Sequence, residues 1–183
     1  MPPGLSLDKT QHGVARGMGL ALLTAIAVFA FSATYLSRVW SVGSDLASRV
    51  TLASWALLLP ASTLFVCIAR LAKHRFVTPD DIHGSALTSG TDKAKLLQAL
   101  LQNTLEQSCL AVPVYIATSY VAPASLLPVV PAAAAMFLVG RLFFFTGYAK
   151  GAPSRAYGFA LTFYPTVLLL LLLLALGVLR IAA

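Results

Sequence analysis

Long apolar stretches separated by short polar segments dominate the chain. A membrane-spanning helix needs about 20 residues to cross the roughly 30 Å hydrocarbon core of a bilayer. Five stretches meet this length, at residues 17–37, 50–69, 96–121, 126–149 and 156–179. The pattern therefore predicts an all-α integral membrane protein with five transmembrane helices.

The third and fourth predicted spans are joined by a very short turn, which predicts that they are antiparallel neighbours. Each contains a single formal charge, Glu106 in the third span and Arg141 in the fourth. A charge at mid-bilayer costs at least about 2.5–3.5 kcal/mol, so it rarely occurs without a partner or a task. Both residues lie about 25 Å from the turn at ~1.5 Å rise per residue. We therefore expect a buried Glu106–Arg141 ion pair.

The composition supports a membrane protein and not a soluble domain. Hydrophobic residues make up 58% of the 183 residues and charged residues only 10%, whereas soluble domains carry about 25% charged residues. The net charge is +7, but the cations lie at the ends of predicted helices, so we expect no nucleic-acid partner. The partners implied are the lipid bilayer and a hydrophobic small molecule or lipid.

The distribution of the cations predicts the orientation in the membrane. With five spans, the N-terminus, the second loop and the fourth loop share one side, and cytoplasmic segments are enriched in Lys and Arg. That side holds Lys9, Arg16, Arg70, Lys73, Arg75, Lys93, Lys95, Arg141, Lys150 and Arg155, whereas the other side holds Arg38, Arg49 and Arg180. We expect a cytoplasmic N-terminus and an outside C-terminus, and the Ala- and Leu-rich composition favours a bacterial inner membrane.

Several other interpretations of the sequence are weaker. The first span resembles a signal peptide, but its uncharged run is longer than the usual 7–15 residues, so we expect a retained helix. Asp80, Asp81 and His83 lie close together, yet Thr78-Pro79 followed by acids is typical of a helix start, and we expect no metal. The sequence contains no P-loop, GxGxxG, GxSxG or HExxH motif. These absences argue against a conventional hydrolase or nucleotide-dependent enzyme.

A polar stripe runs along the third predicted span. Its members are spaced by three or four positions, which places them on one broad helix face: Gln98, Gln102, Asn103, Glu106 and Gln107. In lipid such a face has to turn into the bundle or onto a polar ligand. The alternative is a structural role, in which the stripe fixes helix register and drives oligomerisation.

A second polar cluster ends the fourth span. Arg141, Tyr148 and Arg155 are each seven residues apart, while Gly151 and Pro153 break the helix between the last two. We expect the guanidinium groups and the hydroxyl to converge with Asn103 and Glu106 in a cleft open to the cytoplasmic side. Arginine binds carboxylates bidentately, so such a cleft suits an anionic amphiphile. For Arg155 alone, anchoring at the membrane surface is the alternative.

Together these two motifs resemble the MAPEG family, the membrane-associated proteins of eicosanoid and glutathione metabolism. Asn103-x-x-Glu106 is similar to an N-x-x-E motif of the family, and Arg141…Gly147-Tyr148…Arg155 is similar to its R…Y…R pattern. The layout resembles a bacterial, mattrin-like branch. The resemblance implies a MAPEG-like four-helix membrane domain over residues 48–183, preceded at residues 1–47 by an N-terminal tail and an extra transmembrane helix.

The resemblance also implies a homotrimer that binds glutathione between subunits. Carried over to this chain, the glutathione-binding residues would be Gln102, Asn103, Glu106, Arg141 and Tyr148, and the catalytic residue would be Arg155. In this scheme the Arg155 cation stabilises the glutathione thiolate, which is the nucleophile.

The chain departs from the family pattern at three positions. Ala99 stands where the family usually has Arg, Phe144 where it has Tyr, and Gln107 where the leukotriene-forming branch often has Tyr. Two functions are therefore expected. The first is a membrane-bound glutathione-dependent transferase or peroxidase acting on hydrophobic substrates from the bilayer, which Tyr148 and Arg155 favour. The alternative is a non-catalytic lipid- or ligand-binding scaffold of the same fold, which Ala99 and Phe144 favour.

Overall fold

A computed structural model describes residues 8–84, 87 and 89–182, and within them the chain is helical with no strand. The long helices are α1 (Lys9–Phe31), α3 (Leu46–Val77), α4 (Asp92–Val121), α5 (Val129–Gly147) and α6 (Ala152–Ala182). Between them lie a π-helical segment η1 (Ser32–Leu36), the short α2 (Ser37–Val39) and three 3₁₀ turns, η2 (Pro79–Asp81), η3 (Ala124–Leu126) and η4 (Tyr148–Lys150). The predicted all-α class is confirmed.

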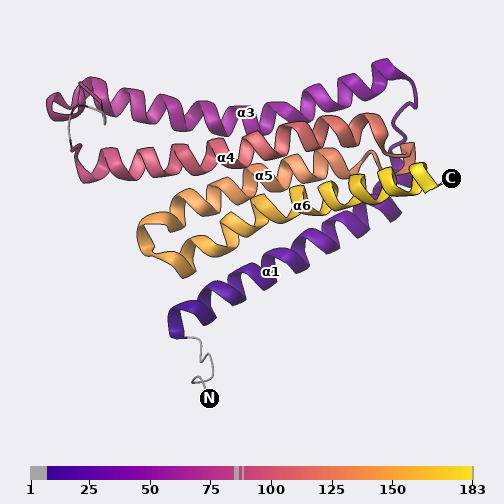
Figure 1. Ribbon diagram of the computed structural model, residues 1–183, viewed down its shortest axis with the longest axis horizontal. Helices are drawn as coiled ribbons and strands as arrows, with labels where there is room; N and C mark the ends of the chain where they lie inside the picture. Colours follow the sequence, from indigo (N-terminus) through magenta and orange to yellow (C-terminus); the bar gives the residue numbers. More distant parts are fainter. Residues whose placement is uncertain (1–7, 85–86, 88, 183) are drawn as a thin grey trace.

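The long helices lie side by side and alternate in direction along the chain, so that the neighbours α1 and α6 run in the same direction (Figure 1). α3 packs on α4 and α5, α5 packs on α6, and α1 lies on the outer side of α6. The start of α1, the α3–α4 connection and the α5–α6 turn share one end of the bundle, while the α4–α5 connection and the C-terminus share the other. The bundle therefore places the turn after α5, which carries Lys150 and Arg155 and which we call the basic turn, at the same end as the start of α4.

Four segments are long and apolar enough to cross a membrane: Lys9–Val39, Leu46–Val77, Ala124–Lys150 and Ala152–Ala182. The chain is therefore an integral, multi-pass membrane protein. α4 is as long as these segments but carries the predicted polar stripe, which lowers its hydropathy. The count of five spans thus stays a prediction, with α4 as the helix in question.

Side chains and backbone groups fix both ends of α4. The Thr91 hydroxyl accepts a hydrogen bond from the Ala94 backbone N–H at 3.2 Å and caps the start. At the other end Arg49 donates to the carbonyl oxygens of Ser119 and Ala122, each at 2.9 Å. These carbonyls lack partners within the helix, and a cation near them is favourable. The anchored ends hold the helix that carries Asn103 in a fixed register.

Glycines allow α5 and α6 to approach to backbone contact. A Cβ atom at Gly158 would collide with the backbone nitrogen of Phe144, and one at Gly147 would collide with the carbonyl oxygen of Ser154. Small residues permit this kind of close helix approach in membranes. The approach brings the end of α5 and the start of α6 together, which sets the geometry of the basic turn.

The α3–α4 connection is organised by the buried Asp81. Its carboxylate accepts from the Thr91 backbone N–H at 2.8 Å, from the Thr91 hydroxyl at 2.6 Å, and pairs with His74 Nε2 at 2.9 Å. Pro79 opens the η2 turn as the sequence predicts, although the Thr78 side chain makes no capping hydrogen bond. Asp81 therefore ties the connection to the start of α4.

Asp81 makes the stability of this connection dependent on pH. The hydrogen bonds from Thr91 lower the pKa of the Asp81 carboxyl below its ordinary value of about 4. The stabilisation is then complete above about pH 4 and is lost as the pH falls through the lower native pKa. We expect Asp81→Asn to lower the melting temperature at pH 6 and to flatten its fall between pH 5 and pH 2.

The measurement is the melting temperature of the detergent-solubilised protein across that range. Asp80→Asn is the matched control, because Asp80 is the exposed neighbouring carboxylate and should leave the pH dependence unchanged. Parallel curves for wild type and Asp81→Asn would contradict the assignment.

Candidate functional site

Arg141 is the buried centre of the polar side chains. It is 0% exposed, and three helices hold it. Nε donates to the hydroxyl of Thr162 on α6 at 3.0 Å, and Nη1 donates to Oδ1 of Asn103 on α4 at 2.8 Å. The guanidinium carbon lies 4.4 Å from the ring centroid of Phe144, within the range of a cation–π interaction.

The predicted Glu106–Arg141 ion pair is wrong. Arg141 is hydrogen-bonded to Asn103 and Thr162, whereas Glu106 is exposed on α4 and accepts from Gln102 Nε2 at 2.9 Å. The depths of the two charges match, but depth does not fix rotation about the helix axis. Asn103 and Glu106 are three positions apart, and at 3.6 residues per turn their directions differ by about 60°. That difference directs Asn103 to Arg141 and Glu106 outward.

One buried donor of the guanidinium group has no partner among the residues that the structure describes. Arg141 Nη2 has no hydrogen-bond acceptor within the described part of the chain, and no carboxylate there is paired with this side chain. Burying an unpaired ion costs several kcal/mol. A buried cation with an open N–H group is a site at which an anion would be stabilised.

A cavity of about 350 Å³ lies next to this cluster, and we call it the α5–α6 pocket. It joins an amide, a phenol and a guanidinium to apolar walls, and it is lined by Val14, Met18, Asn103, Phe144, Tyr148, Ala152, Arg155, Ala156 and Phe159. Asn103 and Phe144, which both contact Arg141, belong to its lining. A few convergent polar groups within an apolar cavity are typical of a small-molecule site.

The turn between α5 and α6 delivers Arg155 to the pocket. Gly151 has a φ of 100°, a conformation that glycine adopts without steric cost. The chain reverses there, and the guanidinium carbon of Arg155 lies 4.3 Å from the centroid of the Tyr148 ring. Stacking on the ring restricts the plane of the guanidinium group and leaves its N–H groups for an anionic partner.

The structure brings together three of the six predicted site residues in one cavity. Asn103, Tyr148 and Arg155 line the α5–α6 pocket, and Arg141 lies directly behind Asn103. Gln102 and Glu106 do not line this pocket; they form an exposed pair on another side of α4. Within the single chain these two residues therefore face away from the bundle, whereas Gln107 of the same stripe is buried.

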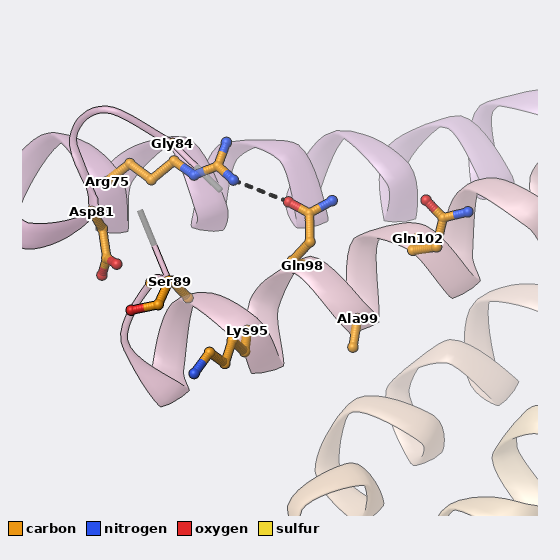
Figure 2. A pocket seen from close by; sticks show the side chains of 10 residues that line it. Arg75, Asp81, Gly84, Ser89, Lys95, Gln98, Ala99 and Gln102 are labelled. Atoms are coloured by element: carbon orange, nitrogen blue, oxygen red, sulfur yellow. Dashed lines mark hydrogen bonds between the residues drawn. The ribbon is translucent and has the colours of Figure 1, made fainter. Parts of the chain in front are cut away.

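Gln102 lines a second cavity of about 370 Å³, at the end of α3 and the start of α4. Figure 2 shows Arg75 reaching across this cavity to Gln98, with its Nη2 donating to Oε1 at 3.1 Å. Lys95 and Ala99 also line it. Ala99 is the position at which the resemblance places an arginine, so here the cations around the cavity come from Arg75 and Lys95 instead.

Sequence reasoning missed two contributors to the site. The first is Thr162, which orients Arg141 from α6 and donates in turn to the Gly158 carbonyl at 3.0 Å; no sequence pattern links it to Arg141. The second is α1, through Val14 and Met18. The spacing of Gly13 and Gly17 is a small-xxx-small pattern that indicates a close helix contact, but not which helix is contacted.

The MAPEG family model matches residues 50–175, more than half of the chain. The matched region includes Asn103, Arg141, Tyr148 and Arg155 and excludes α1. No curated protein and no solved structure matches the chain.

Proposed function

The chain belongs to the MAPEG family, and from this membership we propose that it is a membrane-bound, glutathione-dependent transferase or peroxidase acting on hydrophobic substrates from the bilayer. Membership of this family supports a glutathione-related function in general terms. The observation that carries the specific proposal is the α5–α6 pocket, where Arg155, Tyr148 and Asn103 line one apolar cavity.

Each polar group has a distinct role in the proposed reaction. Arg155 stabilises the thiolate of glutathione, because a nearby cation lowers the pKa of a thiol and only the thiolate is strongly nucleophilic. The Tyr148 hydroxyl and the Asn103 amide position the peptide part by hydrogen bonds. Arg141 contributes positive charge behind them, and an anionic group of glutathione would compensate it. In the transferase reaction the thiolate forms an S–C bond with an electrophilic carbon and displaces a leaving group such as chloride. In the peroxidase reaction it attacks a peroxide oxygen and breaks the O–O bond; the alkoxide takes up a proton to give the alcohol, and a second glutathione converts the resulting sulfenic acid to glutathione disulfide and water.

We further propose a homotrimer in which a neighbouring subunit covers Gln102 and Glu106. These two side chains are exposed on α4 and hydrogen-bonded only to each other among their described contacts. An amide and a carboxylate facing lipid are costly, so a polar surface within a span favours contact with another helix. A site shared between subunits would give Glu106 access to the amino group of glutathione.

A non-catalytic scaffold is the second candidate function, and Phe144 favours it. Phe144 is 3% exposed and packs between two site residues, at 4.4 Å from the Arg141 guanidinium carbon and with its ring centroid 5.2 Å from that of Tyr148. It adds an apolar wall where a hydroxyl would offer glutathione a hydrogen bond. A pocket altered in this way binds lipids or other apolar ligands well without requiring a thiol.

The proposed location is a bacterial inner membrane, with the N-terminus in the cytoplasm and the C-terminus outside. The end of the bundle that holds the start of α1, the α3–α4 connection and the α5–α6 turn carries most of the cations. This asymmetry supports the orientation through the positive-inside rule. The α5–α6 pocket would then bind glutathione that is dissolved in the cytoplasm.

Glutathione binding to the purified, detergent-solubilised protein tests the proposal. We expect calorimetry at pH 7 to detect binding at millimolar or tighter affinity and to show weaker binding in Arg155→Ala and in Glu106→Gln. Arg38→Ala is the matched control, because Arg38 is exposed on the short helix α2 and does not line the pocket.

Failure of an intact trimer to bind glutathione would overturn the glutathione proposal and leave the scaffold. Weaker binding in Arg155→Ala with full retention in Glu106→Gln would restrict the site to the α5–α6 pocket of a single chain.

A further inference from the structure

We propose that α1 forms a wall of the α5–α6 pocket and that Met18, with Val14, limits the size of the hydrophobic substrate that the pocket accepts. The inference deepens the proposed function and rests on it for the identity of the polar head group. It concerns a helix outside the region matched by the family model.

α1 packs closely against the start of α6, at two glycine positions. A Cβ atom at Gly13 would lie 3.0 Å from Pro153 Cβ, and one at Gly17 would lie 3.0 Å from the Tyr157 backbone nitrogen. Only glycine allows the helix to lie this close to the start of α6 without a shift. The second and third turns of α1 are therefore held against the segment that carries Arg155.

The contact continues along the helix. Ala21 and Ala25 are both 0% exposed and belong to a cluster of buried residues with Ala160 and Leu161 of α6. Small side chains on one face and a matching face on α6 give extensive dispersion contact. α1 is thus a fixed part of the bundle.

This packing places two side chains of α1 at the pocket. Val14 and Met18 each follow one of the packed glycines and are four positions apart, so they share a helix face. Both line the cavity that Arg155, Tyr148 and Asn103 also line. Without α1 the cavity would lose this wall and open toward the surroundings of α6.

The chemistry of the lining defines the ligand class. The polar groups come from the core helices, while α1 contributes only a branched aliphatic and a thioether side chain, facing the same cavity as Phe144 and Phe159. The expected ligand is an amphiphile whose anionic or thiol-bearing head lies near Arg155 and whose apolar part lies against α1. Met18 has an unbranched, adaptable side chain, so it sets a limit on apolar bulk without defining one shape.

Two ligand series of increasing alkyl length test the wall. The first contains S-alkyl glutathiones from ethyl to decyl, and the second contains linear alkyl carboxylates over the same lengths. Binding is measured by calorimetry on the full-length, detergent-solubilised protein, with wild type, Met18→Ala and Met18→Trp compared. Leu20→Ala is the matched control, because Leu20 is also on α1 but 60% exposed and absent from the pocket.

We expect Met18→Ala to strengthen binding of the longest members about 10-fold or more relative to the shortest, and Met18→Trp to weaken them by a similar factor. The expected effect is this change in affinity with alkyl length, and Leu20→Ala should behave as wild type at every length. Melting temperatures monitor folding, and Val14→Ala provides a second variant should either Met18 variant fail to fold.

The two series separate this inference from the proposed function. A Met18-dependent length preference for carboxylates without any glutathione binding would support the wall and overturn the glutathione proposal. Glutathione binding with the same length preference in every variant would support the proposed function and overturn the wall. Absence of binding in both series would overturn the wall as well, because the pocket would then hold no amphiphile.

Discussion

At saturating glutathione, replacing Arg155 by alanine is expected to lower the rate of glutathione conjugation about 30-fold at pH 7 and to leave it nearly unchanged above pH 9. A free thiol has a pKa of about 8.5, so only a few per cent is thiolate at pH 7. If the Arg155 cation keeps the bound thiol fully ionised, the gain in thiolate at pH 7 is limited to about 30-fold. At alkaline pH the solvent ionises the thiol without help, and the advantage disappears.

The measurement is the initial rate of conjugation to a chlorodinitrobenzene electrophile between pH 5.5 and 9.5. Arg155→Lys is the matched variant: it keeps the positive charge but cannot reproduce the planar stacking on Tyr148, so we expect it to retain most of the pH profile. A loss of equal size at every pH would mean that Arg155 positions the substrate and does not ionise it. Unchanged rates would leave anchoring at the membrane surface as its role.

The all-helical membrane architecture could be predicted largely from hydropathy, but the positions at which the helices begin and end could not. The predicted span at residues 50–69 lies inside α3, which runs from Leu46 to Val77. Hydropathy reports only the part of a helix that is apolar, whereas the helix continues through polar residues as long as its backbone hydrogen bonds are made. Cap residues define the ends better, as Asp45 does by accepting from the Ser48 N–H at 2.9 Å.

The sequence allowed most of the site residues to be predicted, but not which side chains contact each other. Gly151 and Pro153 indicated a turn after Tyr148, and such a turn brings Arg155 back toward α5, which is what the structure has. The partner of Arg141 was missed, because a separation of three positions along α4 decides whether Asn103 or Glu106 faces it. This choice depends on how α4 is rotated against α5 and α6, which is a property of tertiary packing.

The position of α1 is a further feature that the sequence leaves open. Its apolar run predicts a span, but nothing local specifies which core helix it contacts. The answer depends on the fit of Gly13 and Gly17 against Pro153 and Tyr157, residues more than 100 positions away. A helix without catalytic side chains can in this way become part of a pocket.

Arg141→Met is expected to change the stability of the ligand-free protein little and to weaken binding of an anionic ligand about 100-fold or more. The substitution removes two charge-assisted hydrogen bonds, worth about 1.5–3 kcal/mol each, and a cation–π contact of about 0.5–2 kcal/mol. It also removes a buried charge that pairs with no carboxylate among the described residues, which costs several kcal/mol. The donor Nη2, which has no acceptor among those residues, is removed with it, and such a donor costs about 1–3 kcal/mol. These contributions nearly cancel.

The residues that contact Arg141 remain stable when its guanidinium group is removed. The Thr162 hydroxyl still donates to the Gly158 carbonyl, and Asn103 is only half-buried and borders the pocket. Methionine fills most of the space, whereas Arg141→Ala leaves a cavity and should lower the free energy of unfolding by about 2–5 kcal/mol. Arg141→Ala therefore measures the combined loss of packing and charge, whereas Arg141→Met measures mainly the loss of the charge.

The measurement is the melting temperature of wild type and the two variants, with and without glutathione. It distinguishes an anion-binding role of Arg141 from a purely structural role. A ligand that binds the native state raises its melting temperature; Arg141→Met should lose that rise while melting close to wild type without ligand. A large drop in the ligand-free melting temperature of Arg141→Met would instead mean that the guanidinium group holds α4, α5 and α6 together. The open Nη2 group favours the first outcome, because a charge buried only for packing would be expected to have all of its donors satisfied.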